Sequence, residues 1–76
     1  MSDDKEWQDR VKGLLKAELA KRNINYVQLA GMLAEAYGST ESSQNLSNKI
    51  ARGKFSAVFM VQVCDVIGCN QLTFSS

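Results

Sequence analysis

The apolar residues near the start of the chain recur at steps of three and four, which places them on one face of an α-helix. These residues are Trp7, Val11, Leu14, Leu15 and Leu19. Asp3 and Glu6 have the spacing of a capping box. The pattern therefore predicts a helix from about Asp3 to Arg22 or Asn23. Glu18 falls near the apolar stripe, and we expect it at the exposed end of the stripe with no role of its own.

The second helix has the clearest boundary signals in the chain. Asn25 is a strong N-cap, and Gln28 stands where its side chain can bond back to the cap. Ile24 and Leu29 have the spacing of a hydrophobic staple. The pattern predicts a helix over residues Tyr26–Tyr37, ended by the glycine that follows.

The third predicted helix is polar. It follows the loop at residues 38–42, covers Ser43–Arg52 and is ended by Gly53. Its strongly apolar residues are Leu46 and Ile50, one turn apart, so only a narrow stripe can be buried.

The fourth segment, Ala57–Ile67, is apolar almost all round, so it is either a central helix or partly an oligomer face. Its composition also fits a buried strand, but its length, the Ser56 cap and the Gly68 stop favour a helix. Residues Asn70–Phe74 can add at most one more turn.

These segments predict one all-α domain of four to five short helices over residues 1–76, with residues 1–6 frayed. The expected core consists of Trp7, Val11, Leu15, Leu19, Leu29, Leu33, Leu46, Ile50, Phe55, Phe59, Val63 and Val66.

The composition excludes most catalytic chemistry. Histidine is absent, so the chain lacks the usual general base and every histidine-containing zinc site. Glycine-rich phosphate loops are also absent. We expect no enzyme, no metal site and no cofactor. No apolar run approaches the ~18 residues that span a bilayer, and the acidic N-terminus does not resemble a signal peptide. We therefore expect a cytoplasmic protein with no membrane partner.

The cysteines, Cys64 and Cys69, lie five positions apart on either side of Gly68, so their side chains could touch. In a cytosolic chain, reduced and buried thiols are the favoured state.

The net charge of +1 conceals an asymmetric distribution. The first ten residues carry four carboxylates and two cations, whereas the last three cations, Lys49, Arg52 and Lys54, lie within six positions. This cluster is either a solvated helix end, where the helix dipole favours cations, or a set of phosphate contacts.

The outer side of the third helix carries amides and hydroxyls in place of the usual Glu and Lys. At ~100° per residue, Gln44, Asn48 and Ala51 lie opposite the apolar stripe. Gln and Asn can read adenine in the major groove, and Ser can contact bases or phosphates. The candidate base contacts are Ser43, Gln44, Asn45, Ser47 and Asn48, and the candidate phosphate contacts at the helix end are Lys49, Arg52 and Lys54. A solvated outer helix with no such role is the alternative.

The second and third segments resemble the helix-turn-helix unit of the lambda-repressor/Cro-like superfamily. The matching residues are Leu29 and Ala30 after the Asn25 cap, and Ile50, Gly53 and Lys54 at the end of the third helix. The stretch NLSNKIARGKFS at residues 45–56, with Tyr26, Glu41 and Phe59, is more similar to a small bacterial family of unknown function, over residues 8–70. The resemblance implies a lambda-repressor-like helix-turn-helix fold.

Three features depart from the superfamily pattern. The connection from Leu33 to Leu46 is longer than the usual tight turn, and Ala51 replaces a frequent glutamate. Tyr26 stands where many relatives carry a phosphate-binding glutamine, but its hydroxyl can make that contact, and Gln28 is a further candidate on the same helix. The low net charge indicates a dimer or a weak binder.

The leading hypothesis is sequence-specific binding of double-stranded DNA through the third helix, as in a small bacterial transcriptional regulator. The alternative is a protein-interaction module that uses the apolar fourth helix. A homodimer would suit DNA binding, because one such unit reads one half-site. Its expected contact patch contains Val58, Val61, Val63 and Phe74, unless these residues fill the core of the monomer.

Overall fold

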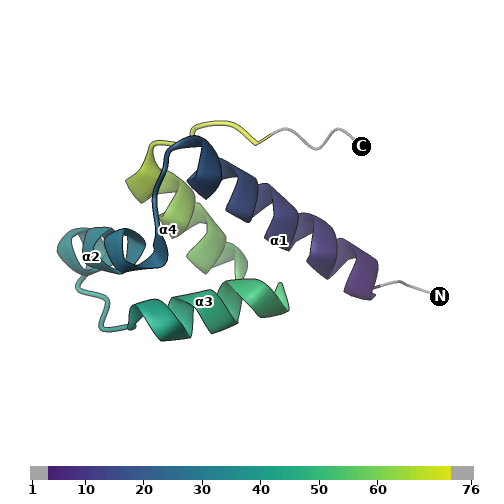
Figure 1. Cartoon of the computed structure of the whole chain (residues 1–76), viewed down its shortest axis with the longest axis horizontal. Coiled ribbons are helices and arrows are strands. Elements are labelled where there is room, and N and C mark those ends of the chain that lie inside the picture. Colours follow the sequence, from purple (N-terminus) through teal and green to yellow (C-terminus); the bar gives the residue numbers. More distant parts are fainter. Residues whose placement is uncertain (1–3, 73–76) are drawn as a thin grey trace.

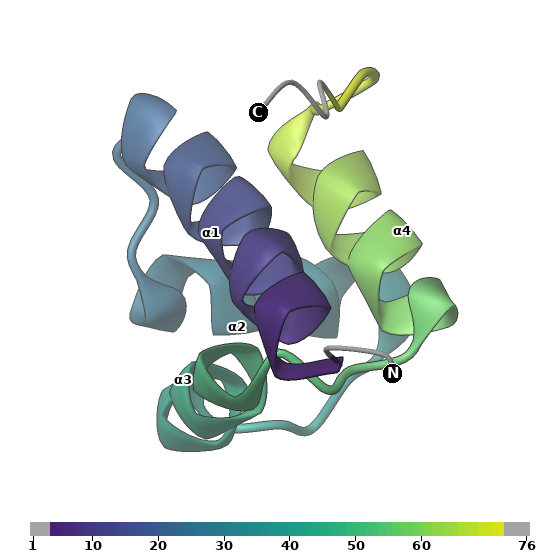
Figure 2. The same cartoon turned by 90° about the vertical axis from the view of Figure 1, so that its right-hand side faces the viewer.

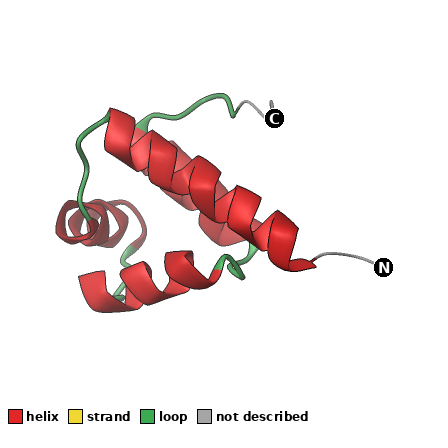
Figure 3. Cartoon of the chain, turned by 45° about the vertical axis from the view of Figure 1, so that its right-hand side comes forward, coloured by secondary structure: helices red, strands yellow, loops and turns green. Residues whose placement is uncertain are grey.

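The computed structural model describes residues 4–72, and this part of the chain contains four helices and no strand (Figure 1, Figure 3). The helices are α1 (Asp4–Lys21), α2 (Tyr26–Tyr37), α3 (Ser43–Arg52) and α4 (Ala57–Ile67). The all-α prediction is confirmed, as are the bounds of α2, α3 and α4. The proposed cap at Asp3 and the aromatic side chain of Phe74 lie outside the described residues, and residues 70–72 form no further helical turn.

Side-chain caps determine where three of the helices begin. The backbone N–H of Gln28 donates to Asn25 Oδ1 at 2.7 Å, and the backbone N–H of Asn25 donates to Gln28 Oε1 at 2.9 Å, which completes the predicted capping box. The hydroxyls of Ser42 and Ser56 accept backbone N–H groups of α3 and α4, each at 3.1 Å. Such caps satisfy N–H groups that have no partner inside the helix.

Gly53 ends α3 and also permits its contact with α1. Its φ of 65° lies in the left-handed region, where a side chain is strained. A Cβ atom at this position would lie 2.5 Å from the carbonyl oxygen of Gln8. The backbone of α1 therefore packs directly on the end of α3.

The arrangement places α3 on the outside of the bundle. Helix α2 packs against α3 and α4, and α1 packs against α3. Figure 1 shows α3 along the lower edge of the molecule, and Figure 2 shows α1 and α4 running side by side in the same direction. One side of α3 consequently faces the other helices, and the opposite side faces solvent.

All four helices contribute to the core. Its buried residues are Leu15, Leu19, Leu29, Leu33, Leu46, Ile50, Phe59, Val63, Cys64, Ile67 and Cys69. The predicted core residues of α2 and α3 are all buried, and the expected burial of both cysteines is confirmed. Val11, Phe55 and Val66 are only half-buried. The expected contact patch on α4 is partly wrong, because Val63 has no exposed area.

The spacing of Trp7 predicts a core position, and this prediction is wrong. Trp7 is 60% exposed, and the guanidinium of Arg10 lies 4.9 Å from the centre of the Trp7 ring. Figure 1 shows that the first turn of α1 extends past the end of α3, which agrees with this exposure. The periodicity identifies the correct face of α1 but not the length of it that is covered.

Glu18 also differs from expectation. It is buried, and its carboxylate bonds to Arg22 Nη1 at 2.6 Å and to Lys21 Nζ at 3.0 Å. Arg22 donates in addition to the backbone carbonyl of Glu18 at 3.0 Å. The hydrogen bonds from Arg22 and then Lys21 hold the pKa of the Glu18 carboxyl below its ordinary value, against the opposing effect of burial. Glu18 thus joins the last turn of α1 to the residues that follow it.

Replacing Gly53 with alanine should destabilise the fold more than the same change at another helix end. Gly38→Ala introduces only the strain of a positive φ, about 1 kcal/mol, because nothing lies within 4 Å of the new Cβ. Gly53→Ala adds the collision with Gln8 and should cost about 2–4 kcal/mol. Urea unfolding of both variants measures the difference, and equal losses would show that α1 does not pack on Gly53.

The stability contributed by Glu18 should disappear in acid. Because its pKa is lower in the folded chain, the unfolded chain binds a proton more readily, so the contribution exists above the ordinary carboxyl pKa and is lost as the pH falls. The stability difference between the wild type and Glu18→Gln should therefore shrink from about pH 5 to pH 3. Urea unfolding across this range measures it, with exposed Glu35→Gln as the matched control. A difference that is independent of pH would contradict the assignment.

Candidate functional site

The outer face of α3 is built around two exposed amides. Leu46 and Ile50 have no exposed area, whereas Gln44 and Asn48, on the opposite side of the helix, are exposed. Gln44 Nε2 donates to Asn48 Oδ1 at 3.3 Å. An amide oxygen can accept two hydrogen bonds, so the Asn48 amide can still present one acceptor and its N–H donors to a ligand. The predicted orientation of both side chains is confirmed.

The other predicted base contacts lie beside this pair. Asn45 is exposed, and it lines the same groove beside α3 as Asn48. Ser43 and Ser47 are half-buried. The face therefore consists of three exposed amides flanked by two partly covered hydroxyls.

The end of α3 carries cations without a carboxylate partner. Arg52 and Lys54 are exposed, and neither forms an ion pair within residues 4–72. The helix dipole favours positive charge at this end, which accounts for their presence without any ligand. An anion that approaches the amide face would also meet both charges.

Lys49 is placed differently from these two cations. Its Nζ atom lies 2.8 Å from the Glu41 carboxylate and 4.7 Å from the centre of the Phe59 ring. Its charge is therefore already paired, so a phosphate would compete with Glu41 for it. The sequence did not indicate this ion pair, because Glu41 lies in the loop before α3 and has no helical spacing to Lys49.

A groove joins the polar residues of α3 to the start of α4. Its volume is about 540 Å³, and the predicted site residues that line it are Asn45, Asn48, Lys49, Arg52 and Lys54. Phe55 and Phe59 form its apolar part, with ring centroids 5.3 Å apart. Amides and cations in one groove suit an anionic ligand that also offers hydrogen-bonding groups.

The two candidates on α2 do not line this groove. Tyr26 is half-buried and packs against the core, and burial raises the pKa of its phenol. Gln28 is exposed, but its carbonyl oxygen already accepts the N–H of Asn25 in the capping box. The NH2 group of the Gln28 side-chain amide remains available to a ligand.

The described part of the chain offers neither a metal-binding cluster nor a membrane-spanning helix. Residues 4–72 contain no group of three or more His, Cys, Asp or Glu side chains arranged to hold a metal ion. Within the same residues, no helix is long and apolar enough to cross a membrane. The groove beside α3 is the candidate site because it brings five of the predicted site residues together.

Comparison with known proteins gives a family but no activity. The protein-family model described as "Domain of unknown function (DUF6471)" matches residues 7–72. No curated protein and no solved structure matches the chain. The match covers all four helices, apart from the first residues of α1.

Proposed function

The chain belongs to the DUF6471 family, whose description states no function, and we propose that it binds double-stranded DNA in a sequence-specific way through α3. The observation that carries this proposal is the outer face of α3. Exposed Asn45 and Asn48 share a groove with Arg52 and Lys54, which form no ion pair within the described residues. Exposed Gln44 does not line this groove but bonds to Asn48 one turn away. A face that only needs solvation does not require this combination of amides and cations.

In this proposal, α2 and α3 form a helix-turn-helix unit and α3 is the recognition helix. Its amides read base edges in the major groove, with Ser43 and Ser47 at the margin of the contact. The support is that α2 packs against both α3 and α4, so α3 is held on a rigid base with its polar face outward. The connecting loop, residues 38–42, is longer than in the lambda-repressor-like superfamily, and the Glu41–Lys49 ion pair ties it to α3. A small transcriptional regulator would use such a unit.

Phosphate binding would come from few groups. Arg52 and Lys54 are the principal contacts, and Lys49 can contribute only when its bond to Glu41 opens. The hydroxyl of Tyr26 and the amide NH2 group of Gln28 would add neutral contacts at the start of α2. Because each neutralised phosphate contributes about −0.9 to the slope of log K against log salt, binding by a monomer should be weak but clearly salt-dependent.

Two kinds of substitution should separate base reading from phosphate binding. A preferred site is first selected from a randomised duplex library, and affinities are then measured by fluorescence anisotropy at two salt concentrations. Gln44→Ala and Asn48→Ala should each cost about 1–3 kcal/mol on the preferred site and little on random DNA. Arg52→Ala and Lys54→Ala should weaken binding to all sequences and reduce the salt slope by about 0.9 each.

The matched control is Lys16→Ala, which removes an exposed cation from α1, away from the groove. It should change affinity less than Arg52→Ala does. Unfolding experiments should show that Gln44→Ala and Asn48→Ala leave stability within about 0.5 kcal/mol of the wild type, because both side chains are exposed. If both variants bind DNA as the wild type does, or if Lys54→Ala unfolds the domain, the face is structural.

A second candidate function rests on α4. Val58 and Val61 are each 67% exposed and lie one turn apart, so α4 presents a small apolar surface to solvent. This surface would bind a protein partner or a second copy of the chain, and a dimer would provide two DNA-reading units.

The oligomeric state tests the second-copy version directly. Sedimentation at micromolar concentration should show a dimer that reverts to monomer in Val61→Asp, since a charge on an exposed residue disrupts the contact without touching the core. A single species of 8.4 kDa for the wild type would reject the homodimer.

A further inference from the structure

The end of α4 brings the two cysteines together through its backbone. The N–H of Cys69 donates to the carbonyl of Cys64 at 2.8 Å, and the N–H of Gly68 donates to the carbonyl of Asp65 at 3.2 Å. With Gly68 at a φ of 79°, these two bonds are those of a Schellman motif. This motif usually places an apolar contact between the residues that Cys64 and Cys69 occupy. Here both positions carry a thiol.

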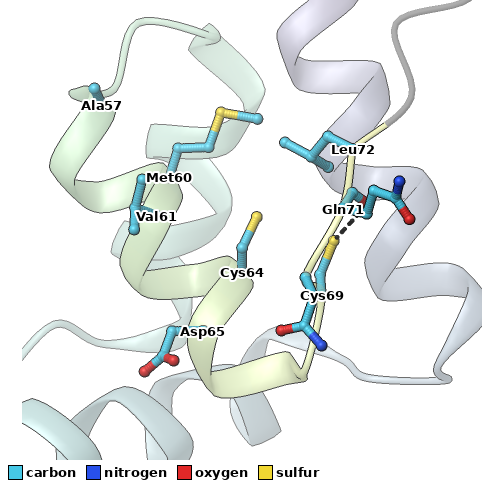
Figure 4. A pocket seen from close by; sticks show the side chains of 9 residues that line it. Ala57, Met60, Val61, Cys64, Asp65, Cys69, Gln71 and Leu72 are labelled. Carbon is cyan, nitrogen blue, oxygen red and sulfur yellow. Dashed lines mark hydrogen bonds between the residues drawn. The ribbon is translucent and has the colours of Figure 1, made fainter.

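The two side chains share one apolar groove. Figure 4 shows both sulfur atoms directed to the same side of the chain, between Met60 on α4 and Leu72 in the segment after it. The groove has a volume of about 440 Å³. Both residues are free thiols that are buried, at 8% and 7% exposure. Neither cysteine is completely covered, so a small reagent can reach the sulfur atoms when the neighbouring side chains move.

The surroundings of Cys64 favour the protonated state of its thiol. Burial raises the pKa of the Cys64 thiol, the adjacent Cys69 and then Glu18 raise it further, and Arg22 opposes them. The Cys69 sulfur donates to the backbone carbonyl of Gln71 at 3.4 Å. Thiol–disulfide exchange through the Cys64 thiolate is therefore slow at neutral pH. The equilibrium between the dithiol and the disulfide is thus a better measure of this pair than the rate of exchange.

We propose that Cys64 and Cys69 are a redox-modification site, which a small disulfide such as oxidised glutathione converts into an intramolecular disulfide. One cysteine loses its proton and attacks a glutathione sulfur, which forms a mixed disulfide and releases one glutathione thiolate. The second cysteine loses its proton and attacks the protein sulfur of that mixed disulfide, which releases the other glutathione thiolate. The protein loses two hydrogens, both thiolates are protonated, and one glutathione disulfide becomes two glutathione molecules.

The fold, and not merely the short separation in sequence, should promote this bond. Closing a loop of so few residues restricts the unfolded chain little. In the folded chain, the two bonds of the Schellman motif already hold the cysteine backbones in position. The disulfide should therefore form at a less oxidising glutathione ratio in the folded protein than in the unfolded one.

The test is a redox titration of the full chain. The protein is equilibrated at pH 8 in buffers of increasing oxidised-to-reduced glutathione ratio, with and without denaturing urea. The reaction is then quenched with acid, and the mass of the intact protein is measured by mass spectrometry. The folded chain should convert to a monomeric species that has lost two hydrogen atoms, at a ratio about tenfold less oxidising than in urea. This comparison needs no variant.

Single variants identify the step. Cys64→Ala and Cys69→Ala should each retain one glutathione on the remaining thiol, because no second cysteine is present to displace it. If either variant fails to fold, the wild-type comparison still decides. Three results would overturn the proposal: a folded wild type that stays reduced, one that accumulates glutathione adducts or disulfide-linked dimers, or equal midpoints with and without urea.

Discussion

The complete burial of Leu46 and Ile50 is the constraint on which the rest of the structure depends. Helix α3 has few other apolar side chains, so its position against α1 and α2 relies on these two residues. Truncation of one such residue typically costs 2–5 kcal/mol, which is a large part of the stability of a domain this small. Because both residues lie on one stripe, their burial also determines which side of α3 faces solvent. The orientation of the amide face follows from the core.

The contact between α1 and Gly53 adds a second constraint, at the C-terminal end of α3. The glycine lets the Gln8 carbonyl approach the backbone, so the exit from α3 and the start of the groove are held by α1. Helix α4 begins directly after Ser56, because the hydroxyl of Ser56 caps the helix. The walls of the groove are thus set largely by backbone contacts, by the Ser56 cap and by the Glu41–Lys49 pair. The exposed side chains of Asn45, Asn48 and Lys54 are not part of these contacts, so we expect their substitution to leave the fold intact.

Two sets of charges around α3 and the end of α1 differ in whether they are paired. Glu18 pairs with Arg22 and Lys21 at the end of α1, and Glu41 pairs with Lys49 beside Phe59, so these charges hold segments together. Arg52 and Lys54 have no such partner in the described residues. Exposed ion pairs contribute little to stability, whereas an unpaired cation beside a polar groove remains available for an anion. This division is the electrostatic basis for assigning the ligand to the end of α3.

The sequence was sufficient wherever a structural feature depends on residues close together in the chain. The Asn25 and Gln28 capping box, the serine caps and the glycine stops have fixed local spacings, so the helix bounds could be predicted. The exposed positions of Gln44 and Asn48 followed from helical periodicity. Features that depend on distant segments could not be predicted: Trp7 is exposed where α1 extends past α3, and the bond between Lys49 and Glu41 requires the loop before α3 to fold back.

The most direct test of the account maps where duplex DNA contacts the folded chain. Backbone amide resonances of the isotope-labelled protein are followed by NMR during a titration with the selected duplex. The account predicts that the largest changes occur in α3 and the residues up to Ser56, with smaller changes at Tyr26 and Gln28 and none on the exposed side of α4. Changes centred on Val58 and Val61, or none at all at saturating DNA, would contradict it.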